Sequence, residues 1–244
     1  EYGIDDSGNS MGAVFFDYNK DGFIDLFVLN NEQSKTIPTN YRKKIKDGTA
    51  VSNDRLYKNN GDGTFSDVTI ESGITVEGFG LGVAISDVNY DGWPDIFIGN
   101  DYITNDLLYI NNQDGTFSNK IRDFIKHQSM FSMGVDISDF NNDGYQDLYV
   151  ASYGTIGDGL DYRSVEKDSR LYQSVKDRIF KNNKDGTFTD ITEESFGESV
   201  NIRSGMSVAC GDVNNDGLLD IYVGNRADQD FIVFNNPRHH GHHN

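Results

Sequence analysis

The sequence has almost no cysteine, little proline and few positive charges. Its 244 residues include one cysteine, Cys210, and three prolines. A single cysteine excludes an internal disulfide, and its place in the apolar run 206–210 favours a buried packing role over that of a nucleophile. Only 21 Lys and Arg stand against 39 Asp and Glu, which gives a formal net charge of −18. Because phosphate backbones are also anionic, this charge argues against nucleic acid as a partner.

Long hydrophobic runs and catalytic motifs are lacking as well. No apolar stretch is long enough to span a bilayer and no signal peptide is present, so we expect no membrane insertion. If the protein is exported, its leader has been removed or omitted. His127 is the only histidine outside the C-terminal tail, and no nucleophile motif stands beside it. We therefore predict a protein that is not an enzyme, although acid pairs from different repeats would be invisible in sequence.

One nine-residue pattern occurs four times, at 17–25, 87–95, 139–147 and 212–220. Each copy carries Asp, Asn, Asp and Asp at positions one, three, five and nine, and Gly at position six. Oxygen side chains at alternate positions of a tight loop suit a hard cation, with the position-seven carbonyl as a further ligand. An EF-hand would need Glu at position twelve, where every copy has Val or Ile within an apolar run that predicts a strand. An ordinary solvated turn is the alternative, which four copies make hard to sustain.

We therefore predict up to four Ca²⁺ sites, each in a loop between two strands. Asn at position three lowers the ligand charge, which should weaken the affinity. Loops of the extracellular type bind Ca²⁺ at about 10⁻⁴–10⁻³ M, which suits a secreted, cell-surface or periplasmic protein. The predicted metal ligands are Asp17, Asn19, Asp21, Phe23, Asp25, Asp87, Asn89, Asp91, Trp93, Asp95, Asp139, Asn141, Asp143, Tyr145, Asp147, Asp212, Asn214, Asp216, Leu218 and Asp220.

A second motif, Asn-Asn-x-Asp-Gly, lies between apolar runs at 59–63, 111–115 and 182–186. It predicts a hairpin turn in which Gly takes the positive-φ position. With the strands on either side of each cation loop, every repeat reads as a four-stranded antiparallel sheet. Such a repeat is typical of a β-propeller blade, which buries its faces only against neighbouring blades. The sequence thus predicts an all-β propeller region over 1–236, with blades at about 10–74, 79–125, 131–196 and 203–236.

The two motifs together resemble FG-GAP/VCBS repeats, the calcium-binding blades of integrin α-subunit propellers. The segment Arg55–Thr69 in particular is similar to repeats of cartilage-acidic-protein-like and ASPIC/UnbV-type secreted proteins. The resemblance covers nearly the whole chain, and it implies the same metal ligands as the loop pattern.

The two ends of the repeat region do not fall at the boundaries of whole repeats. Glu1-Tyr-Gly-Ile4 matches Glu71-Ser-Gly-Ile74, which follows a fourth strand, and Phe231–Asn236 predicts a third strand without a fourth. We expect either a segment of a longer propeller or a blade completed by another chain, in preference to a closed ring of four blades. We interpret the His-rich tail 237–244 as a flexible end or a tag remnant; a transition-metal site is the alternative.

Two long inserts, 31–53 and 152–177, are expected at the end of the blades opposite the cation loops. Insertions on a rigid scaffold often carry recognition, and Tyr and Arg are enriched at binding hot spots. We predict a non-enzymatic scaffold that binds a protein or a neighbouring subunit; a glycan-binding propeller is the rival, and a polysaccharide-active enzyme a weaker one. The candidate partner-binding residues are Tyr41, Arg42, Lys43, Lys44, Tyr153, Tyr162, Arg163 and Tyr172.

Overall fold

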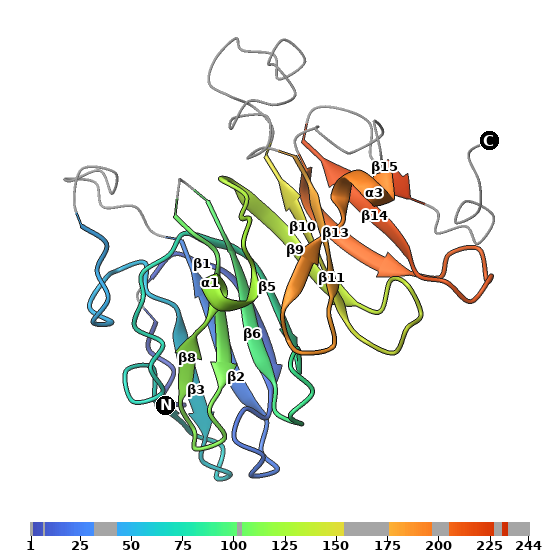
Figure 1. Cartoon of the computed structure of the whole chain (residues 1–244). Helices are drawn as coiled ribbons and strands as arrows, with labels where there is room; N and C mark the ends of the chain where they lie inside the picture. Colours follow the sequence, from blue (N-terminus) through green and yellow to red (C-terminus); the bar gives the residue numbers. More distant parts are fainter. Residues whose placement is uncertain are drawn as a thin grey trace, which may run out of the picture.

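A computed structural model describes residues 2–6, 8–31, 43–101, 104–153, 176–196, 205–226 and 231–233. The described chain forms four antiparallel sheets that follow one another along the sequence (Figure 1). Each sheet is a blade of a β-propeller, as the repeats predict. The His-rich tail 237–244 lies outside the described residues.

Three of the blades have four strands, hydrogen-bonded in sequence order. Blade 1 consists of β1 (Ser10–Phe16), β2 (Asp25–Asn30), β3 (Arg55–Asn59) and β4 (Phe65–Asp67). Blade 2 consists of β5 (Gly80–Ser86), β6 (Asp95–Asn100), β7 (Leu107–Asn111) and β8 (Phe117–Asn119). Blade 3 consists of β9 (Ser132–Ser138), β10 (Asp147–Ser152), β11 (Arg178–Asn182) and β12 (Phe188–Asp190).

Blade 4 has three strands within the described residues, in the order β13 (Gly205–Gly211), β14 (Asp220–Asn225) and β15 (Phe231–Val233). β15 confirms the predicted third strand. Two short helices, α1 (Ile121–Phe124) and α3 (Thr192–Phe196), follow the last strands of blades 2 and 3. Among the described residues, no helix has both the length and the apolar character that crossing a bilayer requires.

The blades pack face to face, and their first strands β1, β5, β9 and β13 are neighbours in that order. Alternation along the second strands supplies both faces: Ile96 and Ile98 of β6 pack toward blade 1, whereas Phe97 packs toward blade 3. Because successive side chains of a strand point to opposite faces, a blade between two others needs apolar residues at every position. The second strands β6 and β10 of blades 2 and 3 are accordingly buried throughout, and β2 of blade 1 is buried as well.

Close approach of the first strands requires glycine. A Cβ on Gly134 of β9 would lie 2.7 Å from Cα of Ser207 on β13, and one on Gly82 of β5 would lie 2.3 Å from the Met133 carbonyl oxygen. Glycine at these positions therefore sets the spacing between blades.

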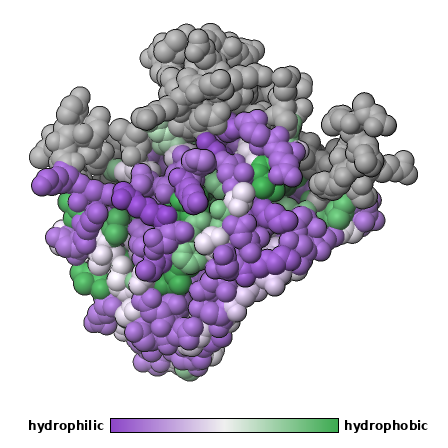
Figure 2. Space-filling model, in the orientation of Figure 1, coloured by the Kyte–Doolittle hydropathy of each residue, from purple (hydrophilic) through white to green (hydrophobic). Residues whose placement is uncertain are grey.

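The surface in this view is mostly hydrophilic, with separate apolar patches (Figure 2). The acidic loops all lie at one end of the blades, because each joins the first strand of a blade to its second (Figure 1). The hairpins joining third to fourth strands lie at the same end. This end is where the predicted cation sites are found.

Candidate cation-binding loops

Four loops connect the first and second strands: loop 1 (17–25), loop 2 (87–95), loop 3 (139–147) and loop 4 (212–220). Each is wound around the carboxylate at position one. In loop 1, Oδ1 of Asp17 accepts a hydrogen bond from the backbone N–H of Asp21 at 3.2 Å, and its Oδ2 accepts from that of Gly22 at 2.9 Å. Gly22 has φ +88°, a conformation that glycine adopts readily. The same pair of bonds recurs in loops 2, 3 and 4.

Positions three and five add further oxygens beside this carboxylate. Oδ1 of Asn19 also accepts from the Asp21 N–H, at 3.1 Å, so the oxygens of positions one and three converge on one nitrogen. Oδ1 of Asp21 accepts from the backbone N–H of Phe23 at 3.0 Å. These local bonds, repeated in all four loops, hold oxygen side chains on the inside of a tight turn.

Position nine plays a different part, because its carboxylate is buried. Oδ2 of Asp25 accepts from the backbone N–H of Tyr18 at 3.1 Å, and Oδ1 accepts from that of Asn59 at 2.8 Å. Asp95 makes the equivalent bonds to Val88 and Asn111. Position nine thus clamps the loop to the third strand of its blade, a function that the sequence pattern does not reveal.

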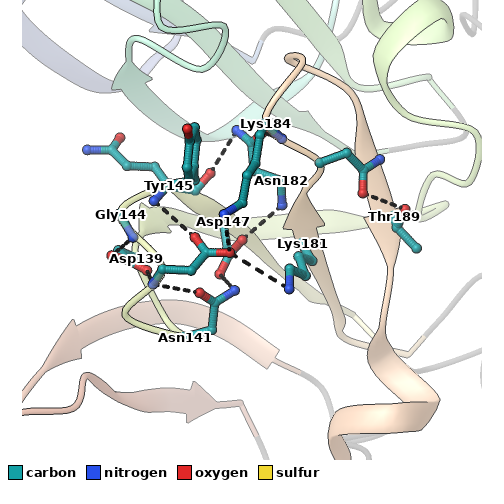
Figure 3. A network of polar contacts seen from close by, with 12 residues as sticks. Asp139, Asn141, Gly144, Tyr145, Asp147, Lys181, Asn182, Lys184 and Thr189 are labelled. Atoms are coloured by element: carbon teal, nitrogen blue, oxygen red, sulfur yellow. Dashed lines mark hydrogen bonds and ion pairs between the residues drawn. The ribbon is translucent and has the colours of Figure 1, made fainter.

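Loop 3 has the same hydrogen bonds to backbone N–H groups at positions one to five, but its position-nine carboxylate has one different partner (Figure 3). The backbone N–H of Asn182 donates to Oδ1 of Asp147 at 2.9 Å, and the side-chain amide of Asn141 donates to Oδ2 at 3.0 Å. The position-three amide therefore links directly to position nine in this loop.

Burial beside other carboxylates makes ionisation of position nine unfavourable. Desolvation, aided by the charges of Asp91 and Asp87, raises the pKa of Asp95 to about 7 against the hydrogen bonds from Asn111 and Val88. Desolvation likewise raises the pKa of Asp147 to about 6. A cation in the loop would favour the ionised form of these groups.

The donor set of each loop fits a hard divalent cation, since it consists of carboxylate and amide oxygens without nitrogen or sulfur ligands. Two carboxylates and an amide oxygen face the turn, and the third carboxylate stands behind them with lone pairs still free on each oxygen. Within the described ranges, no three His, Cys, Asp or Glu side chains gather at one point.

The hairpin asparagines join neighbouring blades. The side-chain amide of Asn111 in blade 2 donates to the carbonyl oxygen of Tyr18 in loop 1 at 2.8 Å, and that of Asn182 in blade 3 donates to Val88 in loop 2 at 3.0 Å. Their role is invisible locally, because each bond spans more than ninety residues of sequence. The recurrence of this Asn at the start of every hairpin is the signal that could have suggested it.

Successive loops also touch one another through position four. Nζ of Lys20 lies 4.9 Å from the ring centre of Trp93 in loop 2. Tyr90 of loop 2 packs edge-on against Tyr145 of loop 3, with 4.7 Å between ring centres. The side chain of Asn142 in loop 3 donates to the carbonyl oxygen of Gly217 in loop 4 at 2.8 Å. The four loops therefore form a connected row at this end of the blades.

The opposite end of the blades is built on another buried aspartate that sequence reasoning missed. Asp54, Asp106 and Asp177 each precede a third strand, and each accepts the backbone N–H of the last residue of the second strand, at 2.7–2.9 Å. Burial raises the pKa of Asp54 and of Asp106 to about 7. Their recurrence before the third strand is the signal that could have identified them.

The predicted partner-binding residues fall only partly within the described chain. Lys44 is half-buried, and burial lowers its pKa while the charges of Glu77, Asp106 and Asp54 act in the opposite direction. The hydroxyl of Tyr153 accepts a hydrogen bond from Arg226 at 2.8 Å. Lys43 is exposed. The other predicted positions, outside the described residues, are Tyr41, Arg42, Tyr162, Arg163 and Tyr172.

Comparison with curated proteins finds integrin α-subunits. Integrin alpha-7 of Rattus norvegicus is 28% identical over 185 residues, which cover 71% of this chain and 15% of that protein. Integrin alpha-6 of Homo sapiens is 41% identical over 90 residues, which cover 32% of this chain and 8% of that protein. The chain therefore spans only a small part of the length of these relatives.

Among solved structures, the chain is similar to a lectin from Agrocybe aegerita, described for its recognition of non-reducing terminal N-acetylglucosamine. The TM-score is 0.42 with 17% identity, covering 86% of this chain and 45% of the lectin. The profile of the FG-GAP-like repeat matches residues 47–98, 87–150 and 157–223, each match running from one blade into the next. The chain belongs to the FG-GAP-like repeat family.

Proposed function

We propose that this protein is a non-enzymatic, calcium-stabilised β-propeller scaffold, outside the cytosol, that binds a protein partner or forms part of a larger assembly, and that the outer faces of blades 1 and 4 pack against a further sheet. The family and the four repeated loops support the calcium component. The observation that carries the scaffold component is a difference in exposure between equivalent positions of inner and terminal blade faces.

The trailing face of a blade, which packs on the blade after it, shows this difference. Tyr18, Val88 and Phe140 occupy position two of loops 1 to 3 and are 5% exposed or less. Val213 occupies the same position in loop 4 and is 61% exposed. On the second strands, Phe27, Phe97 and Tyr149 are buried, whereas Tyr222 of blade 4 is 39% exposed.

On the leading face, which packs on the preceding blade, the first strands show the same contrast. Ile85, Ile137 and Cys210 on the first strands of blades 2 to 4 pack against the cores between the blades. Phe15 is their equivalent in blade 1 and is 64% exposed. Because interior blades bury these positions against a neighbouring sheet, the terminal faces have the shape and chemistry to receive another sheet.

Association can be tested by light scattering over a concentration series in calcium-containing buffer, combined with cross-linking of the chain alone and with copurified proteins. We expect Phe15→Ser and Val213→Ser to weaken whatever association is seen. Ile70→Ser is the matched control, since Ile70 is 60% exposed but lies in the turn that follows β4, outside both faces. Association unaffected by the two face variants would contradict the proposal.

Carbohydrate binding is a second candidate, and one hollow at the loop end favours it. A space of about 460 Å³ between blades 1 and 2 is lined by Trp93 together with polar side chains including Lys58, Glu71, Gln113 and Thr116. An aromatic ring among a few polar groups is the usual lining of a small-ligand site. A glycan array read with and without EDTA, using Trp93→Ala as the negative variant, tests this candidate.

A further inference from the structure

The cation loops share one backbone geometry, but they differ in the positive charge that their own blade places beside them. In loop 1, Nζ of Lys58 lies 3.3 Å from Oδ2 of Asp21, the position-five carboxylate. In loop 3, Nζ of Lys181 and Nζ of Lys184 both lie 3.7 Å from Oδ2 of Asp143. Figure 3 shows the two lysines on the hairpin side of this loop.

Loop 2 has a neutral group in this place. Nε2 of Gln113 donates to Oδ2 of Asp91 at 3.2 Å, and Ile110 stands where blades 1 and 3 carry Lys58 and Lys181. Gln113 and Lys184 occupy the same hairpin position, with φ +67° and +72°, so they approach their loops from matching backbones. Nζ of Lys20 in loop 1 lies 4.9 Å from the ring centre of Trp93 in loop 2, and Nζ of Lys184 lies 4.5 Å from that of Tyr145 in loop 3. Loops 2 and 3 therefore share an ammonium group over the position-seven ring and differ in the charge beside the position-five carboxylate.

From these contacts we infer that the hairpin lysines are built-in counter-ions that grade the cation sites of the three loops whose hairpins the structure describes, so that loop 2 binds a divalent cation more tightly than loop 1, and loop 1 more tightly than loop 3. The inference rests on the proposed calcium binding. An ammonium group beside the position-five carboxylate repels an incoming cation and neutralises part of the charge that attracts it. It also holds the loop together when no cation is bound.

The size of the effect follows from the exposure of the pairs. The side chains of Lys58, Lys181 and Lys184 are 39–49% exposed, so solvent screens each interaction. Partly exposed pairs of this kind correspond to about a two- to fivefold change in affinity for each lysine. Loop 2 should therefore bind on the order of tenfold more tightly than loop 3, and added salt should reduce the difference.

The sequence provides a reporter for loop 2, because Trp93 at position seven is the only tryptophan. Terbium, a calcium substitute that emits when a nearby tryptophan is excited, can be titrated into the wild-type chain to measure the affinity of this loop. Gln113→Lys places an ammonium group where loop 3 has Lys184. We expect the dissociation constant read through Trp93 to rise about two- to fivefold.

The reverse exchange tests loop 3. In a Trp93→Phe, Tyr145→Trp background the single tryptophan stands at position seven of loop 3, and Lys184→Gln reproduces the neutral group of loop 2. We expect the terbium affinity of loop 3 to increase about two- to fivefold. Lys120→Gln is the matched control, because Lys120 pairs with Asp123 at 3.7 Å away from every loop, and it should change neither affinity.

Two results would overturn the inference in distinguishable ways. Terbium binding at both loops with affinities that Gln113→Lys and Lys184→Gln leave unchanged would refute the grading alone, and the proposed calcium binding would stand. No terbium signal at either loop, together with a melting temperature unaffected by EDTA, would refute both. The double variant Lys181→Gln, Lys184→Gln tests the role of the lysines without metal. In chelator, loop 3 of this variant should have less hydrogen-exchange protection than loop 3 of the wild type.

Discussion

The two ends of the blades surround their buried aspartates with different charges. Both are built on a buried aspartate that accepts backbone N–H groups: Asp95 at the loop end of blade 2 and Asp106 at the opposite end. At the loop end, the neighbouring charges are further carboxylates, Asp87 and Asp91. At the opposite end, the neighbouring charge is the half-buried Lys44. The chain thus supplies its own cation at one end, whereas at the other end a few exposed lysines and the proposed Ca²⁺ ions would do so.

Removal of divalent cations should have the largest effect, and it should destabilise the loop end more than the opposite end. A site with Kd of about 0.1 mM in about 1 mM Ca²⁺ contributes roughly 1.4 kcal/mol, and four sites contribute roughly 5–6 kcal/mol to the free energy of unfolding. We expect EDTA to lower the melting temperature markedly and calcium to restore it. Hydrogen exchange should report lost protection at the loop end and not around Asp54 and Asp106. A melting temperature unchanged by EDTA would show that the loops are merely turns.

Loss of the position-nine carboxylate should have the next largest effect on stability. Asp95→Ala leaves the buried N–H groups of Val88 and Asn111 without acceptors, which should lower the free energy of unfolding by about 3–4 kcal/mol even in EDTA. Urea unfolding in chelator measures this. Asp114→Ala, in the exposed hairpin of the same blade, removes bonds to Thr116 and should lower the free energy of unfolding much less. Equal losses in the two variants would contradict the clamp.

The pH dependence of the opposite end should be smaller and has a definite sign. Because burial raises the folded-state pKa of Asp106 to about 7 from an ordinary value of 3.8, the folded chain binds its proton more tightly than the unfolded chain does. Stability from this group is therefore greatest at low pH and falls as pH rises to about 7. Relative to Asp106→Asn, the wild type should lose about 2 kcal/mol between about pH 5 and 7. Urea titrations at several pH values test this, and parallel curves for the two chains would contradict it.

Removal of the built-in cation should have the smallest effect. Lys44→Met keeps most of the apolar stem and deletes the charge that faces Glu77, Asp106 and Asp54. We expect a loss of about 1 kcal/mol at neutral pH and a smaller loss at about pH 5, where Asp54 and Asp106 are protonated and only Glu77 still faces the ammonium group. An equal loss at both pH values would mean that the charges of Asp54 and Asp106 do not contribute to the effect of Lys44.

Much of the fold could be predicted from the sequence because the repeats act locally. Asp17 and Asn19 accept hydrogen bonds from the backbone N–H groups of residues two to five positions later, so the nine-residue pattern carries its own geometry. The hairpin glycines Gly63, Gly115 and Gly186 have the expected positive φ. Strand identities and their order within each blade followed from these two turns and were confirmed.

The loop site was only partly predictable. The sequence identified which positions carry oxygen, but it treated position nine as one ligand among equals, whereas Asp25 and Asp95 clamp the third strand. The lysines beside Asp21 and Asp143 were not noticed, because they belong to a different turn, 37–41 residues along the chain. Such pairs depend on how two turns of one blade meet.

By itself, the sequence determined the four blades, their turns and the oxygen-rich loops, since each rests on contacts between residues close along the chain. Only the tertiary structure decided how the blades meet: that Asn111 and Asn182 reach loops of the preceding blade, that Lys44 lies near Asp54 and Asp106, and that Phe15 and Val213 stay exposed. The asparagine bonds and the approach of Lys44 to Asp106 join residues from different blades. They arise from the packing of one sheet on the next, which no local pattern records.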